Sequence, residues 1–522
     1  MAKEYTAEIV IVGGSLGGCA AAIGAAKIGK NVILTEETAW IGGQLTNQGV
    51  PPDEHPWIEE YGCTGLYRTF RNKVRDYYKR NFPLYEHAME TERLNPGSAI
   101  VSKLSHEPRT ALAVLYEMMA PYIHNGRLQI LSKHKLEAAY VDGDDVRTVT
   151  VQDLETGERR HIHGIYFLDA TDIGELLPLS GTEYVTGAES QSQTGEPHAL
   201  EGEADPLDMQ AVTHVFAIDY VEGEDYTIVK PDQYEFWKEY KPDFWPVKLL
   251  HWDGVYPHNH ERRTFSLFPD GKHFSLWEYR RIIDEKHFLP GTQFQDITTV
   301  NWQQNDYFLG TVFEVDEKSR EKHLEAARQL SLSLLYWMQT EAPRRGGGYG
   351  YPGLRLRPDI LGTQDGLAMK PYIRESRRIK AEFTVLEQHI SKEIRGNLGA
   401  EKFRDSVGIG SYGVDLHPST GNRHYIDFAG LPFQIPLGSM IPIRMNNLIP
   451  ACKNIGVTHI TNGCYRLHPV EWNIGEVAGY LAAYAIEKQT TPRQVYENES
   501  ILEDFQRLLT NNGVQLEWPV HH

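Results

Sequence analysis

Residues Ile9–Gly18 read Ile-Val-Ile-Val-Gly-Gly-Ser-Leu-Gly-Gly, and this stretch predicts the centre of the fold. Its four aliphatic residues form a short apolar run that is typical of a strand buried inside a parallel sheet. The glycines lead into Cys19–Gly29, a series of small residues that favours a helix and ends on a glycine suited to its C-terminus. The stretch therefore predicts a strand, a tight glycine turn and a helix.

Such a turn is suited to a pyrophosphate, because the first N–H groups of the helix are free and the helix dipole is positive there. Gly13 permits the tight turn and Gly18 permits close packing of helix on strand. Ser15 replaces the middle glycine of the pattern G-x-G-x-x-G, and its small hydroxyl is a tolerable substitute. We expect Gly13, Gly14, Ser15, Gly17 and Gly18 to contact the phosphates.

A second apolar run, Asn31–Glu36, ends on a carboxylate roughly twenty residues beyond the turn, where the ribose hydroxyls of a bound adenosine are expected. Taken alone, an acid at a strand end is more often a solvated side chain. The turn and the two apolar runs together favour a ribose contact for Glu36, with Glu37 beside it.

Several later segments resemble one family. Gly42-Gly43-Gln44 resembles the second glycine pair of FAD enzymes of the glutathione reductase type, and Leu168–Glu175 is similar to their Ala-Thr-Gly-x-Gly-Asp stretch. Leu448–Ala451, followed by Asn473–Gly479, resembles their closing flavin motif. Pro371–Arg378 resembles a segment that recurs in a broad family of FAD-dependent oxidoreductases, most of which lack assigned substrates. The matches span nearly the whole chain.

This resemblance implies FAD as the cofactor and an α/β fold. A Rossmann-type FAD-binding domain with a three-layer ββα arrangement is expected to carry an inserted α+β substrate-binding domain. The expected parts are residues 1–210 (FAD-binding domain, first part), 211–425 (substrate-binding or cap domain), 426–488 (return of the FAD-binding domain) and 489–522 (C-terminal helical tail). The resemblance adds further expected FAD contacts: Gly42, Gly43, Gln44, Ala170, Thr171, Asp172, Asn473, Ile474 and Gly475.

Composition limits the class of protein. A chain of 522 residues can bury a large core, and its net charge of −19 argues against nucleic-acid or anionic-membrane partners. No apolar stretch has the length or position of a signal peptide or a membrane span, which predicts a soluble cytoplasmic protein. The four cysteines form no C-x-x-C pair, so neither a redox dithiol nor a metal site is expected. A homo-oligomer is left open.

Periodicity predicts the remaining elements. Helices are expected at residues 66–80, with a basic outer face, and at 111–124, 324–338 and 470–486; strands are expected at 128–131, 136–141, 146–151, 161–168 and 447–451. Basic and aromatic residues at 66–80 can also bind nucleic acid, but the acidic chain favours a solvated face. The aromatic residues of 220–306 can form either a stacking surface for a substrate or a bulky core.

Gly408–Gly413 spells the dinucleotide pattern literally, but its surroundings contradict it. No apolar strand precedes it, and Val414–Pro418 cannot open a helix. The sequence therefore predicts no second dinucleotide unit for NAD(P)H.

The chemistry is expected just before the last predicted helix, at Asn462–Pro469. Arg466 suits the negative charge of a reduced flavin, and His468 suits removal of a proton when an alcohol is oxidised. Either residue can instead be structural, Arg466 as an ion-pair partner and His468 as a helix cap. His417, Tyr372 and Arg374 are weaker candidates, and His55 and Cys63 are conceivable sites of covalent flavin attachment for which packing is favoured.

The leading hypothesis is a dehydrogenase or oxidase that transfers a hydride from a C–OH carbon of a small polar, carbohydrate-like molecule to FAD. The electron acceptor, oxygen or another, is not identified by the sequence. Two alternatives remain: a flavin monooxygenase, and a flavoprotein that acts on RNA or a protein. The missing second dinucleotide unit argues against the first, and the acidic charge argues against the second.

Overall fold

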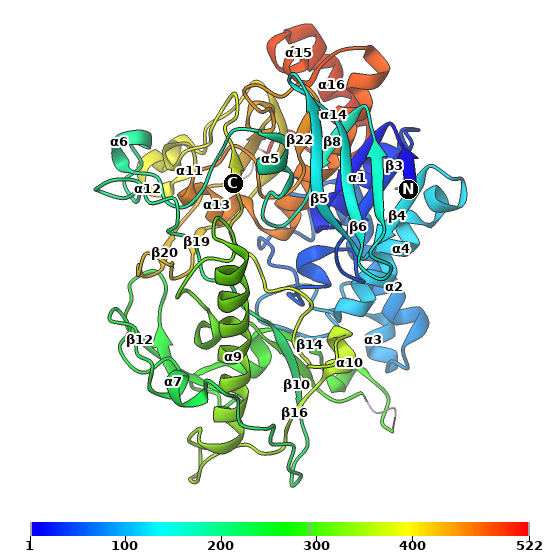
Figure 1. Cartoon of the computed structure of the whole chain (residues 1–522). Helices are drawn as coiled ribbons and strands as arrows, with labels where there is room; N and C mark the ends of the chain where they lie inside the picture. The colour runs from blue at the N-terminus through cyan, green and yellow to red at the C-terminus, as the bar shows by residue number, and fades with distance from the viewer. Residues whose placement is uncertain (1–2, 292–293, 520–522) are drawn as a thin grey trace.

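A parallel sheet that contains Ile9–Val12 lies in the upper half of the molecule in Figure 1. The computed structural model describes residues 3–291 and 294–519. The strand order is β22-β8-β2-β3-β4, with β2 (Ile9–Val12), β3 (Val32–Glu36), β4 (Leu128–Ser132), β8 (Tyr166–Asp169) and β22 (Leu448–Pro450). Val12 pairs with Thr35 on one side and Asp169 on the other, so three carboxyl ends meet at one edge. The expected α/β fold with a parallel sheet is confirmed.

Two helices rich in small residues, α1 (Leu16–Lys27) and α14 (His468–Lys488), pack against each other beside this sheet. A Cβ atom at Gly475 would lie 2.0 Å from the carbonyl oxygen of Gly17, and one at Gly479 would lie 2.3 Å from that of Ala21. Glycines therefore let the two backbones touch. The predicted strand, turn and helix are present, and α14 begins slightly before the expected start because Pro469 is compatible with a first helical turn.

An outer sheet forms a third layer. Its order is β1-β7-β6-β5, with β1 (Lys3–Thr6), β5 (His134–Asp142), β6 (Asp145–Asp153) and β7 (Arg159–His163). Val10 and Val12 of β2 share a core with Val149 of the outer sheet, whereas Ile9 and Ile11 face the core on the helical side. This alternation follows from the strand period of two and gives the expected ββα layers.

One predicted strand, residues 161–168, is divided in the structure. Its first part belongs to β7 of the outer sheet and its second part to β8 of the central sheet. The chain crosses between the layers at Gly164, where a Cβ would lie 2.7 Å from a methyl group of Val10. Continuous β propensity concealed this crossing, because both halves are extended.

The expected basic face of the first long helix, α2 (Gly65–Asn81), is wrong in part. Arg71 and Arg75 are buried rather than solvated. Arg71 binds Glu54 and Glu59 at 2.9 and 2.8 Å, and Arg75 binds Glu59 at 2.6 Å. These acids lie in the preceding loop, so periodicity within the helix could not reveal them. The helix packs beside α4 (Pro108–His124).

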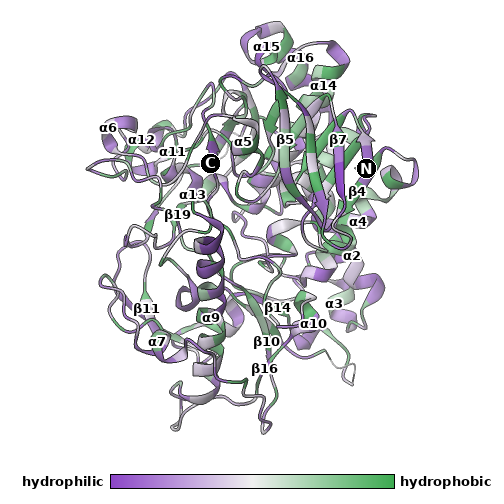
Figure 2. Cartoon of the chain, viewed as in Figure 1, coloured by the Kyte–Doolittle hydropathy of each residue, from purple (hydrophilic) through white to green (hydrophobic). Residues whose placement is uncertain are grey.

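A second hydrophobic core lies in the lower half of Figure 1 and spans residues from Met209 to Ile373. Its antiparallel sheet has the order β14-β15-β10-β16, with β10 (Phe216–Tyr220), β14 (Arg281–Ile283), β15 (Ile297–Val300) and β16 (Leu354–Leu356). Helix α9 (Glu317–Thr340) is hydrophilic in its first half and more apolar toward its end in Figure 2. Trp237 and Trp337 are buried in this core, so aromatic residues here serve largely as packing.

Smaller strands surround the junction of the two halves: β11 (Asp253–Val255), β12 (Arg262–Ser266) and β13 (Phe274–Ser275) form one sheet, while β18 (Ser406–Gly410) pairs with β21 (Phe433–Pro436) and β19 (Val414–Leu416) pairs with β20 (Ile426–Phe428). Gly408–Gly413 therefore enters a strand pair and leads to β19, not to a helix, as expected. A domain boundary at 425/426 would cut the β19–β20 hairpin. We therefore propose that the return segment begins near residue 406.

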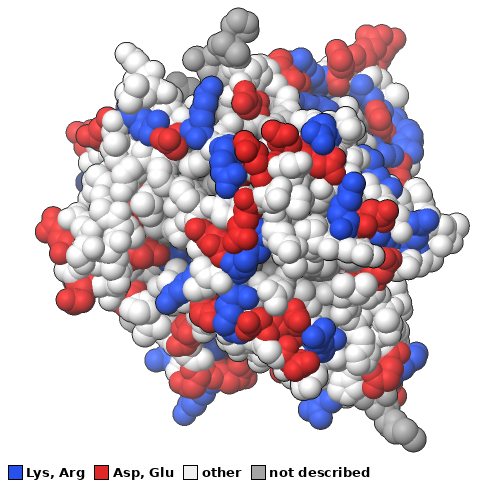
Figure 3. Space-filling view, turned by 90° about the horizontal axis from the view of Figure 1, so that it is seen from above, with Lys and Arg blue, Asp and Glu red and all other residues white. Residues whose placement is uncertain are grey.

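The remaining elements are short or C-terminal. They are α3 (Glu86–Glu90), α5 (Leu176–Ser180), β9 (Tyr184–Val185), α6 (Gln191–Thr194), α7 (Tyr234–Glu239), α8 (Leu276–Tyr279), α10 (Pro358–Leu361), β17 (Arg378–Ile379), α11 (Glu387–Ile390), α12 (Lys392–Arg395), α13 (His459–Tyr465), α15 (Pro492–Glu497) and α16 (Glu499–Asn511). Helices α15 and α16 lie within residues 489–522, where a helical tail was predicted, and α16 buries Leu502, Phe505 and Leu509. Residues 520–522 lie outside the described ranges. In the described ranges, no helix has the length and apolarity needed to cross a bilayer. Acidic and basic side chains are interspersed on the face shown in Figure 3.

Candidate functional site

The glycine turn after β2 is held by contacts that leave no room for side chains. Gly13 has φ +100, and a Cβ there would lie 2.4 Å from the carbonyl oxygen of Ala170. A Cβ at Gly18 would lie 2.2 Å from the carbonyl oxygen of Gly13. Ser15 caps α1, because its Oγ accepts the N–H of Gly18 at 3.2 Å. The serine that departs from the glycine pattern thus stabilises the helix end itself.

The second glycine pair packs directly on this turn. The N–H of Gly42 donates to the carbonyl oxygen of Gly14 at 2.7 Å, and a Cβ at Gly43 would lie 2.9 Å from Cα of Ser15. Gly42 and Gly43 have φ +109 and +50, which glycine adopts without strain. The two glycine segments are therefore parts of one cradle.

Glu36 is placed at the carboxyl end of β3, as predicted. It is 3% exposed, and its carboxylate accepts the N–H groups of Gly14 at 2.9 Å and Thr38 at 2.8 Å. A small cavity opens beside it and is lined by Gly13 and Thr171. Glu37 also lines this cavity. Burial raises the pKa of its carboxyl, but Lys370, 3.1 Å away, has the larger combined effect, so the pKa is lowered overall.

A buried polar cluster continues from the glycine cradle toward α14. Glu471 accepts the N–H of Gly17 at 3.2 Å and a hydrogen bond from Gln44. Lys453 is 1% exposed on its side chain and lies 3.5 Å from Asp172 and 3.7 Å from Glu471. The sequence prediction included Gln44 and Asp172 but missed Lys453 and Glu471. Their position was a usable signal, since Lys453 lies shortly after the end of β22 and Glu471 lies in the first turn of α14.

Other expected FAD contacts have packing roles in the structure. The side chain of Ile474 is fully buried, and Asn473 donates to the carbonyl oxygen of Val407 at 3.4 Å. Gly475 is required by the contact between α14 and α1 described above. The hydroxyl of Thr171 donates to Asp169 at 2.7 Å at the end of β8. Contacts of Asn473, Ile474 and Gly475 with the flavin remain a proposal.

A separate cavity lies where both cores and the return segment meet. We call it the arginine cavity because Arg280, Arg374 and Arg466 line it, with Asp53, Asp415 and His417. Aromatic side chains complete its walls: Tyr279, Trp302, Tyr372, Tyr412 and Tyr425. These residues come from segments far apart in the sequence. The cavity is polar, cationic and aromatic, which suits a small molecule with several oxygen atoms.

His417 lines this cavity and forms an ion pair or hydrogen bond with a buried carboxylate. Its Nδ1 lies 2.6 Å from Oδ2 of Asp306, and its Nε2 lies 3.6 Å from Asp415. Asp306 also binds Arg374 at 2.9 Å and accepts from Thr213 at 2.7 Å. Burial alone would raise the pKa of Asp306, but Arg374 and His417 lower it to about 2. Asp306 is thus ionised and orients the ring through Nδ1, while Nε2 points toward Asp415, a cavity-lining carboxyl whose pKa is lowered by His417 and Arg466.

The two predicted catalytic residues have different surroundings. Arg466 lines the arginine cavity, donates to the hydroxyl of Tyr372 at 3.0 Å and donates to the carbonyl oxygen of Asp415 at 2.9 Å. His468 is fully buried and is not part of the cavity wall. Its Nδ1 accepts the N–H of Asp53 at 3.0 Å, and burial lowers its pKa to about 4. The structure therefore brings Arg466, Tyr372, Arg374 and His417 together and leaves His468 behind the wall.

The two residues considered for covalent attachment are packed. His55 Nε2 lies 3.0 Å from the carbonyl oxygen of Gly62, and its ring contacts Trp518. Burial raises the pKa of the Cys63 thiol to about 11, which disfavours the reactive thiolate. Among the residues that the structure describes, no group of three or more His, Cys, Asp or Glu side chains is arranged to hold a metal ion.

Comparison with known proteins decides the family. A family model described as FAD dependent oxidoreductase matches residues 8–509. The chain belongs to this family. It is also 25% identical over 182 residues to soluble pyridine nucleotide transhydrogenases of Mycobacterium bovis (strain BCG / Pasteur 1173P2) and Mycobacterium tuberculosis (strain ATCC 25177 / H37Ra), a match that covers 35% of this chain and 33% of each relative. The matched segment thus spans about a third of those proteins.

Two solved structures are similar over most of the chain at low identity. A geranylgeranyl bacteriochlorophyll reductase-like protein of Thermoplasma acidophilum is 10% identical and covers 98% of this chain and 85% of its own, with a TM-score of 0.33. A myxobacterial chondrochloren halogenase is 10% identical and covers 97% and 79%, with a TM-score of 0.34.

FAD is the cofactor of this FAD dependent oxidoreductase, and the residues present fit it. The glycine cradle has no room for an added Cβ, and it borders the cavity beside Glu36, where a cofactor could lie against the backbone. Two buried side-chain oxygens in the segment that follows Gly43, Oε1 of Gln44 and Oδ1 of Asn47, have no hydrogen-bond partner among the described residues. Unpaired buried acceptors beside such a cradle are expected where a cofactor supplies donors.

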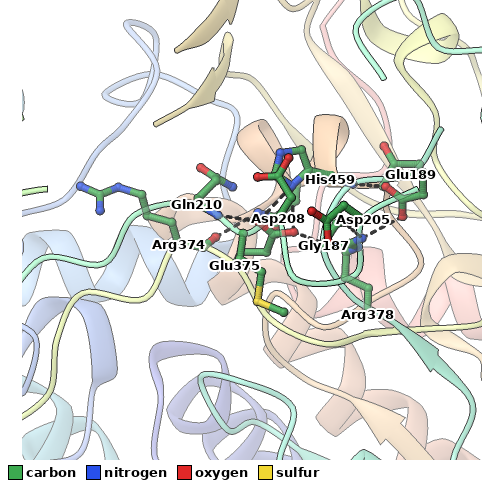
Figure 4. A network of polar contacts seen from close by, with 12 residues as sticks. Gly187, Glu189, Asp205, Asp208, Gln210, Arg374, Glu375, Arg378 and His459 are labelled. Atoms are coloured by element: carbon green, nitrogen blue, oxygen red, sulfur yellow. Dashed lines mark hydrogen bonds and ion pairs between the residues drawn. The ribbon is translucent and has the colours of Figure 1, made fainter. Parts of the chain in front are cut away.

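The segment Arg374–Arg378 connects the arginine cavity to a second buried network, which Figure 4 shows. Arg374 points away from the network in this view, whereas Glu375, Arg378 and His459 converge. Glu375 binds Arg378 at 2.5 Å and His459 at 2.9 Å, and Arg378 also binds Glu189 at 2.8 Å. The segment that resembles the oxidoreductase family therefore supplies one arginine to the cavity and anchors itself with the residues that follow.

Proposed function

We propose that this FAD dependent oxidoreductase oxidises an alcohol group of a small polar, carbohydrate-like molecule in the arginine cavity. The observation that carries the proposal is the His417–Asp306 pair, in which a buried carboxylate 2.6 Å from Nδ1 orients a cavity-lining imidazole. A base held by an orienting carboxylate is the arrangement that proton removal requires.

In the proposed reaction, His417 Nε2 removes the proton of the substrate hydroxyl while the C–H bond of the same carbon breaks. FAD, when bound, would supply the two-electron acceptor for the hydride of that C–H bond, and the C–O bond of the substrate becomes a C=O double bond. Asp306 stabilises the imidazolium of His417, because the carboxylate is already ionised. The guanidinium of Arg466 stabilises negative charge that develops in the cavity.

We propose His417, and not the predicted His468, as the base. His468 is fully buried, and its low pKa of about 4 makes it a weak proton acceptor at neutral pH. Its hydrogen bond from the N–H of Asp53 gives it a positioning role instead, since Asp53 lines the cavity and lies 3.3 Å from Arg280.

Anaerobic mixing with a panel of sugars, polyols, hydroxy acids and amines tests the reaction. We expect one class of alcohols to bleach the oxidised flavin absorbance without NAD(P)H. His417→Gln should keep the flavin and slow this reduction about a hundredfold or more, and Asp306→Asn should slow it in the same direction. His468→Asn serves as the comparison and should slow it less.

Other results would change the proposal. Bleaching by amines alone would replace the alcohol substrate, and consumption of NAD(P)H that depends on substrate and oxygen would favour a monooxygenase. A third result would identify His468 as the base. In that case His468→Asn would slow flavin reduction about a hundredfold or more, and His417→Gln would react like the parent.

A further inference from the structure

The arginine cavity contains buried donors without acceptors. Nε of Arg280, Arg374 and Arg466 and Nε1 of Trp302 are buried and have no hydrogen-bond partner in the described part of the chain. All four residues line the cavity, and no buried side-chain acceptor among its lining residues is left unpartnered in the same way. Buried polar groups are normally paired, so this one-sided excess predicts a ligand that is rich in acceptors.

Arg280 is the most loosely held of the three guanidinium groups. It lies 3.3 and 3.5 Å from the two carboxylate oxygens of Asp53 and 3.4 Å from the hydroxyl of Tyr279. Charge-assisted hydrogen bonds are usually about 2.7–2.9 Å long. Arg374, by contrast, binds Asp306 at 2.9 Å and the carbonyl oxygen of Ala211 at 2.8 Å. The N–H donors of Arg280 are thus only weakly hydrogen-bonded to the neighbouring residues.

The position of Arg280 is fixed by burial and by a backbone hydrogen bond, although the hydrogen bonds of its guanidinium group are long. The residue is 7% exposed and directly precedes β14, where its carbonyl oxygen accepts the N–H of Thr299 at 3.2 Å. The lining side chains contain three arginines against two aspartates, Asp53 and Asp415, with Asp306 engaged behind them by Arg374 and His417. A guanidinium whose position is fixed and whose hydrogen bonds are long still has donors that match the fork geometry of a carboxylate.

The two sides of the cavity suit different functional groups of a single bound substrate. Arg280, beside Asp53 and Tyr279, offers donors to an anion, whereas His417, beside Asp306 and Asp415, offers a base to a hydroxyl. We infer that the substrate is a carboxylate-bearing alcohol, a hydroxy acid or a sugar acid, whose carboxylate binds Arg280. This inference depends on the proposed alcohol oxidation and names its substrate class.

Matched pairs of compounds test the inference on the purified holoenzyme. Three- to six-carbon hydroxy acids and sugar acids are each titrated anaerobically beside the alcohol that lacks the carboxylate, for example lactate with propane-1,2-diol and gluconate with sorbitol. Flavin absorbance reports both binding and reduction. We expect an acid to act at a concentration at least tenfold lower than its neutral partner.

Substitutions assign the effect to Arg280. Arg280→Gln should raise the apparent Kd for the acid at least tenfold and leave that of the neutral partner unchanged, while Arg280→Lys, which keeps the charge, should have an intermediate effect. Arg281→Lys is the matched control, because this buried neighbour binds Asp284 at 2.9 Å and Asp296 at 3.0 Å outside the cavity. Thermal unfolding of each holoenzyme checks that the variants are folded.

The outcomes separate this inference from the proposed function. If neutral alcohols bleach the flavin as effectively as their acids, or if Arg280→Gln weakens both equally, the carboxylate inference is overturned and alcohol oxidation stands. If acids perturb the flavin spectrum through Arg280 but no alcohol is oxidised, the proposed function fails and anion binding stands. Absence of any acid-induced change overturns the inference as well.

Discussion

The glycine cradle and the arginine cavity are built in opposite ways. The cradle consists of Gly13–Gly18 and Gly42–Gly43, and it works because side chains are missing where backbones touch. The arginine cavity depends on long charged side chains from distant segments, among them Asp53, Arg280 and His417. Local sequence contains almost all the information for the cradle. Only the folded chain brings the residues of the cavity together.

The strongest way to break the cradle is to add a side chain to it. Gly18→Val should abolish retention of flavin, because even its Cβ would lie 2.2 Å from the carbonyl oxygen of Gly13, and backbone cannot move aside cheaply. The ratio of flavin to protein absorbance after purification measures the effect. Gly202→Ala is the control, since no atom lies within 4 Å of its added Cβ. Full flavin occupancy in Gly18→Val would contradict the role of the cradle.

The same contrast explains how much could be predicted from the sequence. Spacing alone located β2, the glycine turn, α1 and Glu36, because these features lie within one continuous stretch. The resemblance located Gln44 and Asp172. Lys453, Glu471 and Asp53 were not among the predicted residues, since a lone charged residue has no periodic pattern that marks it as buried; for Lys453 and Glu471, closeness to the ends of β22 and α14 was the signal that could have been used. His468 was predicted as the base because of its place in the sequence, and this stays untested; the Asp306 carboxylate beside His417 could not be predicted, because it is 111 residues away in the sequence.

The charged network next to the arginine cavity should be more sensitive than surface ion pairs. Arg378→Met removes a fully buried guanidinium and leaves Glu375 and Glu189 without it. Breaking a buried pair in this way costs about 3–5 kcal/mol of unfolding free energy. Arg328→Met, in a partly exposed pair with Asp365, should cost less than about 1 kcal/mol. Equal losses in urea unfolding would remove the distinction between the buried and exposed networks.

A buried acid in α14 gives the helix pair of the cradle a pH dependence. Burial raises the pKa of Glu476 from 4.5 to about 7, although Trp472 donates to it at 3.0 Å. The stability that this group contributes is fully present below its unfolded pKa and is lost as the pH rises through about 7. Glu476→Gln should therefore unfold less readily than the parent at pH 8, by up to about 3 kcal/mol, with little difference at pH 4.5.

Urea unfolding at several pH values measures this difference, with Glu503→Gln on the exposed side of α16 as the control. Parallel stability curves for the parent and Glu476→Gln between pH 4.5 and 8 would show that Glu476 is not the source.

The smallest expected effect concerns Ser15, where the cradle departs from the strict glycine pattern. Its Oγ accepts the N–H of Gly18 at 3.2 Å, so the side chain serves the helix while leaving the cradle open. Ser15→Ala should cost about 1 kcal/mol of unfolding free energy, and Ser15→Gly only a few tenths, because glycine is itself an acceptable N-cap. Both variants should retain flavin, measured by absorbance, since neither adds an atom beyond Cβ. If Ser15→Gly loses flavin as Gly18→Val is expected to do, then the hydroxyl of Ser15 binds the cofactor directly, and the cradle would share with the arginine cavity a dependence on side-chain contacts.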